Sequence, residues 1–515
     1  MRHRRSRKNR GGKCLIACWL VILASAASVS GAQSGGSAER KTAKHFESIR
    51  RQPSLVFEFL RQMPKGGDLH NHLSGAVYAE SFIRWAVQDG LCVDRETAAL
   101  TMPPCDPARN RPLVSTALQD AGLYTRMLDA YSMRGWRPAS ESGHDHFFAT
   151  FGKFGAATNS HTADMLAEVR SRAAGEHLEY LELMFNPDGG QAARLGASLE
   201  WNDDLAKLRD VLLSGGLQEI VATASRELDK IEQTEQQELH CGAPQPDPGC
   251  GVEARYLYQV ARGLPRGQVF AQILAGFEMA SKDPRVVGLN LVMPEDWYVP
   301  IHDFNLHMRM LDYLHEIYPK IHITLHAGEL TLAIVPPEEL FHIRASIERG
   351  HAERIGHGVD IMYEPDPAGL LRRMAKEKIL VEICLTSNDS ILGVSGARHP
   401  LPVYLRFGVP VALATDDAGV SRSTMSQEYQ RAVETYSLSY PQLKKIARAS
   451  LEFSFLPGTS LWANFDKLRE ADVCARSAGK AKSQSSSCRQ LLSTSDKAKA
   501  EFELEKAYAD FESRF

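Results

Sequence analysis

The 515-residue sequence has little of what membrane-spanning, fibrous or nucleic-acid-binding proteins require. Beyond the N-terminus it has no apolar stretch long enough to cross a bilayer, and it has no internal repeat. A content of 43% hydrophobic and 24% charged residues excludes disordered, collagen-like and polytopic membrane proteins. After the N-terminus, acidic residues outnumber basic ones, because seven Lys and Arg lie in the first 13 residues and no acid precedes Glu39. Without residues 1–32 the formal net charge falls from −3 to −10, so we predict no nucleic-acid partner.

The N-terminal 32 residues have the pattern of an export signal. A basic run is followed by about fourteen apolar residues at positions 14–27, and then by small residues up to Ala32. That apolar stretch is short for a membrane span and typical of a secretory signal peptide, with cleavage near Ala26 or Ala32. An uncleaved N-terminal anchor is the alternative. We predict a periplasmic or secreted protein without integral membrane association after cleavage.

Seven cysteines follow residue 32, and none of their spacings fits a cysteine-type zinc site. Six of them form pairs that are close in sequence and lie in stretches rich in Pro, Gly or Ser, which is typical of short disulfide loops in an oxidising compartment. The predicted bridges are Cys92–Cys105, Cys241–Cys250 and Cys474–Cys488. Cys384 lies in the apolar run 379–385 and is predicted to be a free, buried thiol.

Short β-branched apolar runs alternate with longer helical patterns along the chain. The clearest runs are residues 177–185, 254–260, 286–292, 321–325, 379–385 and 409–414. This alternation predicts an α/β fold with a parallel sheet, and we expect a (β/α)₈ TIM barrel at residues 60–465. Cysteine-bearing insertions are expected at 92–112 and 226–252. The predicted flanks are an N-terminal leader (33–59, loose over 33–45) and a partly helical C-terminal tail (466–515, weakly structured over 477–495).

Polar clusters follow the apolar runs, at the ends where a TIM barrel gathers its active site. They lie at residues 68–72, 326–329, 354–358 and 415–417. His70 and His72 are two residues apart, so on an extended segment both rings point to the same side. Together with His326 and Asp416 they form a donor set suited to Zn²⁺. Taken singly, His326 could be a core histidine and Asp416 a helix N-cap.

The four clusters, in this order and spacing, resemble the adenosine deaminase family of the amidohydrolase superfamily. The resemblance rests on Met63-Pro64-Lys65, His70-Asn71-His72-Leu73, His326-Ala327-Gly328-Glu329, Arg354-Ile355-Gly356-His357-Gly358 and Thr415-Asp416-Asp417. It covers roughly residues 60–460. The export signal and the cysteine-bearing insertions look most like the secreted, growth-factor-like branch of that family.

The resemblance implies a zinc-dependent hydrolysis of adenosine to inosine and ammonia, with one zinc ion per chain on His70, His72, His326 and Asp416. Among the catalytic residues that it implies, His357 would orient a water molecule or take its proton, and Glu329 would protonate a purine ring nitrogen. Asp417 would hold the other edge of the purine. The alternatives are a carboxylate beside the metal for Glu329, a further zinc ligand for His357 and a helix N-cap for Asp417. Residues 286–293 offer no lysine that could bridge two metals, which favours a single ion.

Substrate contacts are less clearly marked, because the sequence departs from the family pattern. Ser74 stands where relatives often carry an acid, and Met293 or Pro294 stands where a glycine is common. The further candidate substrate contacts are Glu182, Phe148 and Phe151. The phenylalanines belong to an aromatic cluster, 147–154, that forms either a lid over the base or part of a helical core.

The predicted partner is therefore a small-molecule purine nucleoside, and a homodimer is a candidate assembly. Two other functions stay open at this point. One is deamination of another aminopurine, such as adenine or a modified adenosine. The other is a secreted binding or signalling protein that uses the barrel as a scaffold.

Overall fold

The computed structural model describes residues 36–138, 141–158, 160–471, 473–474 and 485–515. The predicted signal peptide lies outside the described residues. Among the helices of the described part, none is both long enough and apolar enough to cross a membrane.

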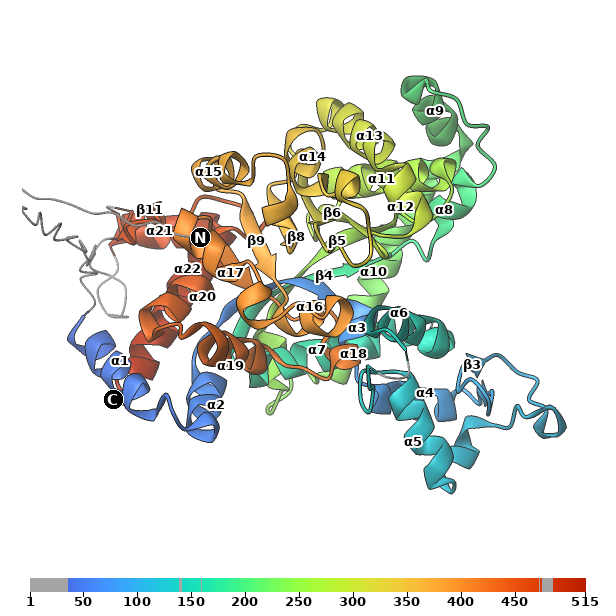
Figure 1. Ribbon diagram of the computed structural model, residues 1–515, viewed down its shortest axis with the longest axis horizontal. Coiled ribbons are helices and arrows are strands. Elements are labelled where there is room, and N and C mark those ends of the chain that lie inside the picture. Colours follow the sequence, from blue (N-terminus) through green and yellow to red (C-terminus); the bar gives the residue numbers. More distant parts are fainter. Residues whose placement is uncertain (1–35, 139–140, 159, 472, 475–484) are drawn as a thin grey trace, which may run out of the picture.

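Eight parallel strands form one sheet that curls into a barrel, with helices around its outside (Figure 1). Neighbouring strands pair in the order β1-β4-β5-β6-β7-β8-β9-β10. Their bounds are β1 Gly66–His72, β4 Leu178–Phe185, β5 Glu253–Ala261, β6 Val286–Val292, β7 His322–Ala327, β8 Arg354–His357, β9 Leu380–Ile383 and β10 Val411–Leu413. The predicted (β/α)₈ barrel is confirmed.

The first and last strands of the barrel meet through the C-terminal end of β1 and a residue that follows β10. Asn71 and Asp416 form a parallel bridge. The backbone N–H of His72 donates to the carbonyl of Asp416 over 3.2 Å, and that of Asp416 donates to the carbonyl of His70 over 2.9 Å. The barrel is therefore closed at the C-terminal ends of its strands.

The strands are buried on both faces, as their continuous apolar runs predict, and the helices cover the outer face. α11 carries buried side chains on all sides, because it packs against β5, β6, α8 and α13. The helix bounds are α1 Ser37–Ile49, α2 Pro53–Gln62, α3 Leu73–Ala76, α4 Ala79–Gln88, α5 Ala121–Ala130, α6 Gly143–Phe154, α7 Thr162–Gly175, α8 Gln191–Gly196, α9 Leu205–Leu212, α10 Gln218–Glu238, α11 Arg266–Lys282, α12 Tyr298–His302, α13 Phe304–Ile317, α14 His342–Glu348, α15 Pro367–Glu377, α16 Leu385–Leu392, α17 Leu401–Phe407, α18 Ala418–Ser421, α19 Met425–Tyr436, α20 Tyr440–Glu452, α21 Ser486–Thr494 and α22 Asp496–Glu512.

The predicted N-terminal leader is not loose, and that expectation is wrong from Ser37 onward. α1 and α2 pack against each other and against the C-terminal part of the chain (Figure 1). Phe46 of α1 is fully buried and lies 5.0 Å, centroid to centroid, from Phe59 of α2. Phe59 in turn contacts Phe511 of α22 over 5.1 Å. The polar composition of residues 33–45 conceals a helix that places Ala43, Phe46 and Ile49 against the core.

All three predicted disulfides are present, and Cys384 is free and buried. Cys92–Cys105 ties the short strands β2 Cys92–Val93 and β3 Leu100–Thr101 into an insertion that projects from the barrel with α4 and α5 (Figure 1).

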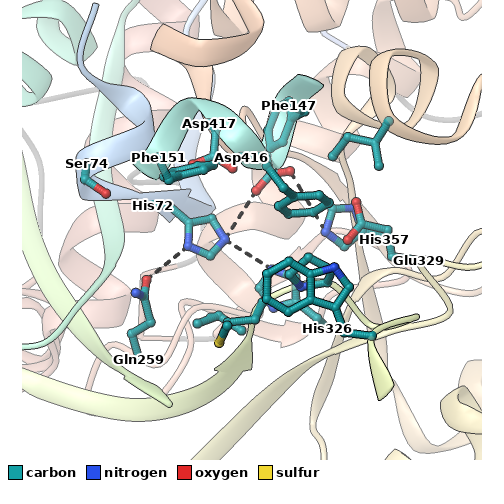
Figure 2. A pocket seen from close by; sticks show the side chains of 16 residues that line it. His72, Ser74, Phe147, Phe151, Gln259, His326, Glu329, His357, Asp416 and Asp417 are labelled. Carbon is teal, nitrogen blue, oxygen red and sulfur yellow. Dashed lines mark hydrogen bonds and ion pairs between the residues drawn. The ribbon is translucent and has the colours of Figure 1, made fainter. Parts of the chain in front are cut away.

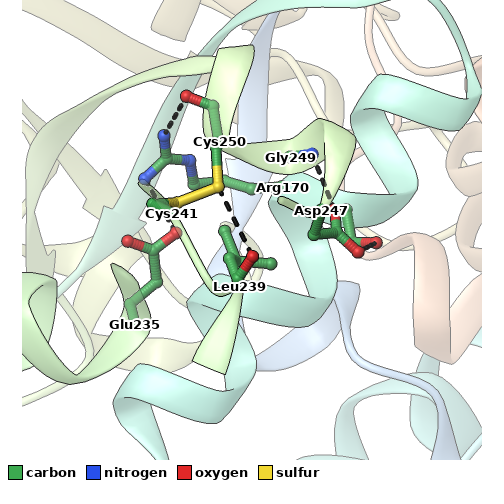
Figure 3. The surroundings of a disulfide bond; sticks show 8 residues. Arg170, Glu235, Leu239, Cys241, Asp247, Gly249 and Cys250 are labelled. Carbon is green, nitrogen blue, oxygen red and sulfur yellow. Dashed lines mark hydrogen bonds and ion pairs between the residues drawn. A yellow bond between two sulfur atoms is a disulfide. The ribbon is translucent and has the colours of Figure 1, made fainter. Parts of the chain in front are cut away.

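The bridge Cys241–Cys250 ties the loop that follows α10 (Figure 3). Arg170 of α7 donates to Glu235 over 2.7 Å and so joins α7 to the end of α10 beside this bridge. A Cβ atom at Gly249 would lie 2.7 Å from the backbone nitrogen of Ser171, so the loop approaches α7 too closely for any other residue there.

The tail contains a small hairpin, β11 Trp462–Asn464 with β12 Arg469–Glu470, followed by α21 and α22. The expectation of weak structure over residues 477–495 is wrong for α21, where Cys488 is buried and bridged to Cys474. The rest of that segment, up to residue 484, lies outside the described residues.

Candidate active site

The polar clusters at the strand ends surround one cavity of about 200 Å³ (Figure 2). The cavity opens at the C-terminal face of the barrel, where enzymes of this architecture have their active sites. It is lined by His72, Ser74, Phe147, Phe148, Phe151, Gln259, Val292, Met293, Pro294, Trp297, His326, Glu329, His357, Ile391, Asp416 and Asp417.

Three of the histidines direct the same ring nitrogen to a common point at the floor of this cavity. The Nε2 atom of His326 lies 3.0 Å from Nε2 of His70 and 3.1 Å from Nε2 of His72. The Oδ1 atom of Asp416 lies 3.4 Å and 3.3 Å from the same atoms of His70 and His72. Ligands from β1, β7 and the end of β10 thus converge as their spacing predicts.

Each of these histidines has an oxygen partner on its other ring nitrogen. His70 Nδ1 lies 2.7 Å from a carboxylate oxygen of Glu382, His72 Nδ1 lies 3.1 Å from Oε1 of Gln259, and His326 Nδ1 lies 2.9 Å from Oδ1 of Asn290. Such partners hold the proton on Nδ1 and leave Nε2 free to coordinate a cation. These three partner residues lie on β9, β5 and β6, so strands of the barrel wall hold the histidine rings in position.

Close packing of backbone and side chains fixes the ligands further. A Cβ atom at Gly356 would lie 2.6 Å from Cε1 of His70, so glycine is required under that ring. Asp416 has a left-handed backbone (φ 57°), and its Oδ2 accepts a hydrogen bond from Ser387 over 2.7 Å. His357 (φ 67°) and Met293 (φ 85°) share this unusual conformation. Non-glycine residues in this conformation are strained and cluster at functional sites, where the surrounding structure holds them.

His357 faces the same point from β8. Its Nδ1 atom lies 3.0 Å from the side-chain amide nitrogen of Asn388, and its Nε2 atom lies 4.0 Å from Oδ2 of Asp416. Asn388 can donate to Nδ1, which leaves Nε2 of His357 directed into the cavity. His357 is also close enough to His70, His326 and Asp416 to belong to a metal-binding group, so geometry alone permits the alternative role of a further ligand.

Glu329 lies above the cluster, at the end of β7. It is 7% exposed, and its Oε1 atom lies 3.6 Å from Nδ1 of His357. Burial raises the pKa of Glu329 well above its usual value, and the charges of Asp416 and Glu295 raise it further. Glu295 also accepts the backbone N–H of Glu329 over 2.8 Å and so fixes that turn. A carboxyl group with a raised pKa keeps its proton to a higher pH than an exposed glutamate does, which suits it to act as an acid.

The predicted substrate contacts divide into two groups. Asp417, Ser74, Met293, Phe148 and Phe151 line the cavity. The phenylalanines come from α6, which covers the cavity, so the aromatic cluster forms a wall of the site as well as part of the helical core (Figure 2).

Asp417 lies in the cavity wall opposite Glu329. A Cβ atom at Gly75 would lie 1.5 Å from Oδ1 of Asp417, so glycine makes room for this carboxylate. Asp417 precedes α18, but its side chain makes no capping hydrogen bond. Burial, and then the charge of Asp416, raise the pKa of Asp417 well above its usual value.

The prediction for Glu182 is wrong. Its carboxylate points into the barrel interior, where it accepts hydrogen bonds from Arg354 (2.5 Å), Tyr180 (3.0 Å) and the backbone of Phe455 (2.7 Å). Arg354 also donates to Glu382 over 2.6 Å. Glu182 therefore belongs to a buried ion-pair layer beneath the cavity and does not line it.

The donor set fits a divalent metal ion. In the described part of the chain, four buried polar atoms around the cavity have no hydrogen-bond partner: Asp416 Oδ1, His357 Nε2, Glu329 Oε1 and Asp417 Oδ1. Buried polar atoms are rarely left unpaired, so these four point to a bound ion, water or ligand. Imidazole nitrogens with one carboxylate are the donors that catalytic zinc sites use.

A parallel eight-stranded barrel with this His/Asp cluster at its strand ends has the architecture of the metal-dependent amidohydrolases. The sequence model named adenosine deaminase matches residues 221–470 of the chain. The adenosine deaminase of Salmonella typhimurium is 36% identical over 151 residues, which are 29% of this chain and 42% of that protein. The adenine deaminase of Chelativorans sp. is 30% identical over 232 residues, 44% of this chain and 65% of that protein. Over residues 221–470, just under half of its length, the chain belongs to the adenosine deaminase family.

These two alignments span less than two thirds of either relative. Solved structures extend the likeness of the fold. The adenine deaminase of Arthrobacter aurescens (TM-score 0.50, 17% identity) covers 79% of this chain and 97% of its own. The Arabidopsis ADAL protein complexed with IMP (TM-score 0.52, 20% identity) covers 77% and 94%. The likeness to the growth-factor-like branch stays a prediction, as does the homodimer.

Proposed function

We propose that this protein is a zinc-dependent hydrolytic deaminase that converts adenosine, and 2′-deoxyadenosine, to inosine or deoxyinosine and ammonia. The observation that carries the proposal is the convergence of three Nε2 atoms and Asp416 beneath the buried carboxyl group of Glu329, whose pKa is raised. One zinc ion would be held by His70, His72, His326 and Asp416. When bound there, it would lower the pKa of a water molecule toward ~7 and supply a nucleophile at neutral pH.

The residues around the cluster divide the proton transfers between them. Because Asn388 donates to Nδ1 of His357, the neutral ring carries its proton on Nε2, the atom that faces the cavity, and His357 orients the attacking water from there. Glu329 donates a proton to the purine ring nitrogen next to the attacked carbon, which makes that carbon electrophilic. Asp417, on the opposite wall, holds the other edge of the purine. The reaction consumes one water and releases ammonia.

The apolar walls suit a flat heterocycle. Phe148 and Phe151 of α6, with Met293 and Trp297 of the loop after β6, enclose the space above the polar floor. Small-molecule sites are typically apolar with a few placed polar groups, which is the division found here.

Free adenine is a second candidate substrate. The cavity of about 200 Å³ lies below the usual range of roughly 300–1,000 Å³, which favours a compact ligand. The Chelativorans relative also carries the name adenine deaminase.

We also propose that the protein acts outside the cytoplasm. The signal pattern of residues 1–32 and the three disulfides support this location. Cell fractionation of the full chain and of a chain without residues 1–32 tests it. The activity should leave the cytoplasmic fraction only when those residues are present.

The decisive experiment incubates the zinc-loaded protein with adenosine, 2′-deoxyadenosine and adenine and follows ammonia release. Glu329→Gln keeps the size of the side chain but removes its acidic proton. We expect kcat to fall ~10²-fold or more, as for a lost general acid, while zinc content stays at about one per chain. Wild-type kcat in this variant, or no ammonia from any of the three compounds with the wild-type enzyme, would contradict the proposal.

A further inference from the structure

A second cavity, of about 620 Å³, adjoins the active-site pocket. We call it the vestibule. Trp297 and Ile391 line both spaces, so the vestibule and the pocket share a wall. The other residues that line the vestibule belong to the segment before α6 and its first turn, the loop after β6, the loop after β7 and the end of α16. A ligand that extends beyond the pocket along this shared wall enters the vestibule.

The reacting groups fix which end of the ligand would extend. Glu329, His357 and Asp417 line the pocket around the metal-binding cluster, so the carbon that loses its amino group must face inward. The pocket is smaller than most small-molecule sites. Because the sugar of a nucleoside projects from the other side of the purine, it lies toward Trp297, whose side chain is 43% exposed.

One ion pair spans the vestibule between its two main walls. His144 Nε2 of α6 lies 2.9 Å from Oδ1 of Asp296, in the loop between β6 and α12. His144 Nδ1 lies 3.0 Å from Asp145. Burial alone would lower the pKa of His144, but the hydrogen bonds and charges of these two carboxylates raise it to about 9. The pair therefore presents a carboxylate and an imidazolium side by side in the lining of the vestibule.

Apart from His144, the ionisable side chains that line the vestibule are acidic; behind the lining, Arg431 pairs with Asp389 over 2.7 Å and Arg398 donates to the carbonyl of Gly393. The ionisable lining residues are Glu141, His144, Asp145, Asp296 and Asp389. None of the residues that line either cavity, among those the structure describes, is a lysine or an arginine. Arg137, which lies between two lining residues in the sequence, donates to the carbonyl of Trp136. A phosphate would meet like charge here, whereas hydroxyl groups can donate to the carboxylates.

Resting on the proposed deaminase function, we propose that the vestibule is the sugar subsite of the enzyme. The His144–Asp296 pair recognises the hydroxyls of an uncharged nucleoside, and the surrounding carboxylates exclude nucleoside phosphates. The substrate class is therefore the nucleoside, in preference to both the free base and the nucleotide.

The test compares kcat and KM for adenosine, adenine and AMP in the zinc-loaded full chain. Asp296→Asn should raise KM for adenosine about tenfold, the loss expected for one hydrogen bond to a charged group, and leave kcat within about twofold. The kcat/KM for adenine should not change, because the base does not reach the vestibule. Asp296→Lys should raise kcat/KM for AMP relative to adenosine at least tenfold. His144→Gln should act on adenosine in the same direction as Asp296→Asn and carries the test if the Asp296 variants do not fold.

Asp312→Asn is the matched control, because Asp312 forms a similar surface pair with His351 over 2.7 Å and lines neither cavity. It should match the wild type on all three compounds. Equal effects of Asp296→Asn on adenosine and adenine, or none on either, would overturn the subsite. No ammonia from any compound with the wild-type enzyme would refute the deaminase function itself, which is a different outcome.

Discussion

Replacing Asn290 by leucine tests how far the barrel wall controls metal binding. The Oδ1 atom of Asn290 accepts two hydrogen bonds from His326, one from the backbone nitrogen (3.0 Å) and one from Nδ1 (2.9 Å). Asn290 is completely buried, so water cannot replace the lost oxygen. Leucine fills nearly the same volume, which limits the change to the two hydrogen bonds.

Two effects of different size follow. Loss of a partner that orients a ligand typically weakens metal affinity by ~10–100-fold, or about 1.4–2.7 kcal/mol. Each unsatisfied buried donor costs about 1–3 kcal/mol of stability, and this cost appears also without metal. Asn290→Leu should therefore have a lower melting temperature as apoprotein, and in addition a smaller gain in stability on addition of zinc.

The assay is a competition titration of zinc between the protein and a chelator of known affinity, with thermal unfolding of both apo and zinc-loaded forms. Asn290→Asp is the control, because it keeps the acceptor oxygen in place and should retain zinc about as well as the wild type. If Asn290→Leu binds zinc within twofold of the wild type, or if Asn290→Asp loses as much affinity, the reasoning about oriented ligands is wrong.

Three further predictions concern pH, disulfides and the sugar side of the pocket. Burial, helped by nearby carboxylates, raises the pKa of Glu179 to about 8 from an ordinary 4.5. Between about pH 4.5 and 8 the folded protein keeps a proton on Glu179 that the unfolded chain loses, so the free energy of unfolding falls as the pH rises through this range. Thermal unfolding at several pH values should show a smaller fall in melting temperature for Glu179→Gln than for the wild type. Replacing both Cys241 and Cys250 by alanine should lower the free energy of unfolding by about 2–3 kcal/mol in denaturant titrations, and no change would mean that the loop is already fixed by α7. Ser74→Ala should raise KM for adenosine modestly and leave kcat nearly intact, and abolished turnover would give Ser74 a chemical role.

The sequence predicted the barrel and its ligands because both have a signal of fixed spacing. Buried parallel strands are continuous apolar runs, and polar residues directly after such runs share one face of the barrel. His70 and His72 could be placed on the same side from their separation alone. The order of the clusters then supplied the family resemblance, which the comparisons confirm.

The residues that support the ligands could not be predicted in this way. Asn290 and Glu382 are single polar residues within apolar strands, and Gln259 is one of several polar residues of β5; no spacing relates any of them to the histidines that they contact. Glu182 has the same kind of position, and its assignment to the substrate failed because its carboxylate meets Arg354 in the barrel interior. Pairings of this kind depend on strand register and on which face a side chain occupies. The vestibule could not be predicted from the sequence either, because the residues that line it come from four separate loops and helix ends.

The bonds that close the barrel have a consequence for how the protein matures. The hydrogen bonds that join the first and last strands belong to the backbones of His70, His72 and Asp416, whose side chains form most of the donor set. These residues come from opposite ends of the barrel sequence, so they meet only after every intervening strand has taken its place. A chain with an open or wrongly ordered barrel would lack a complete donor set. Only molecules with a correctly assembled barrel would therefore bind the metal, and misfolded molecules would not.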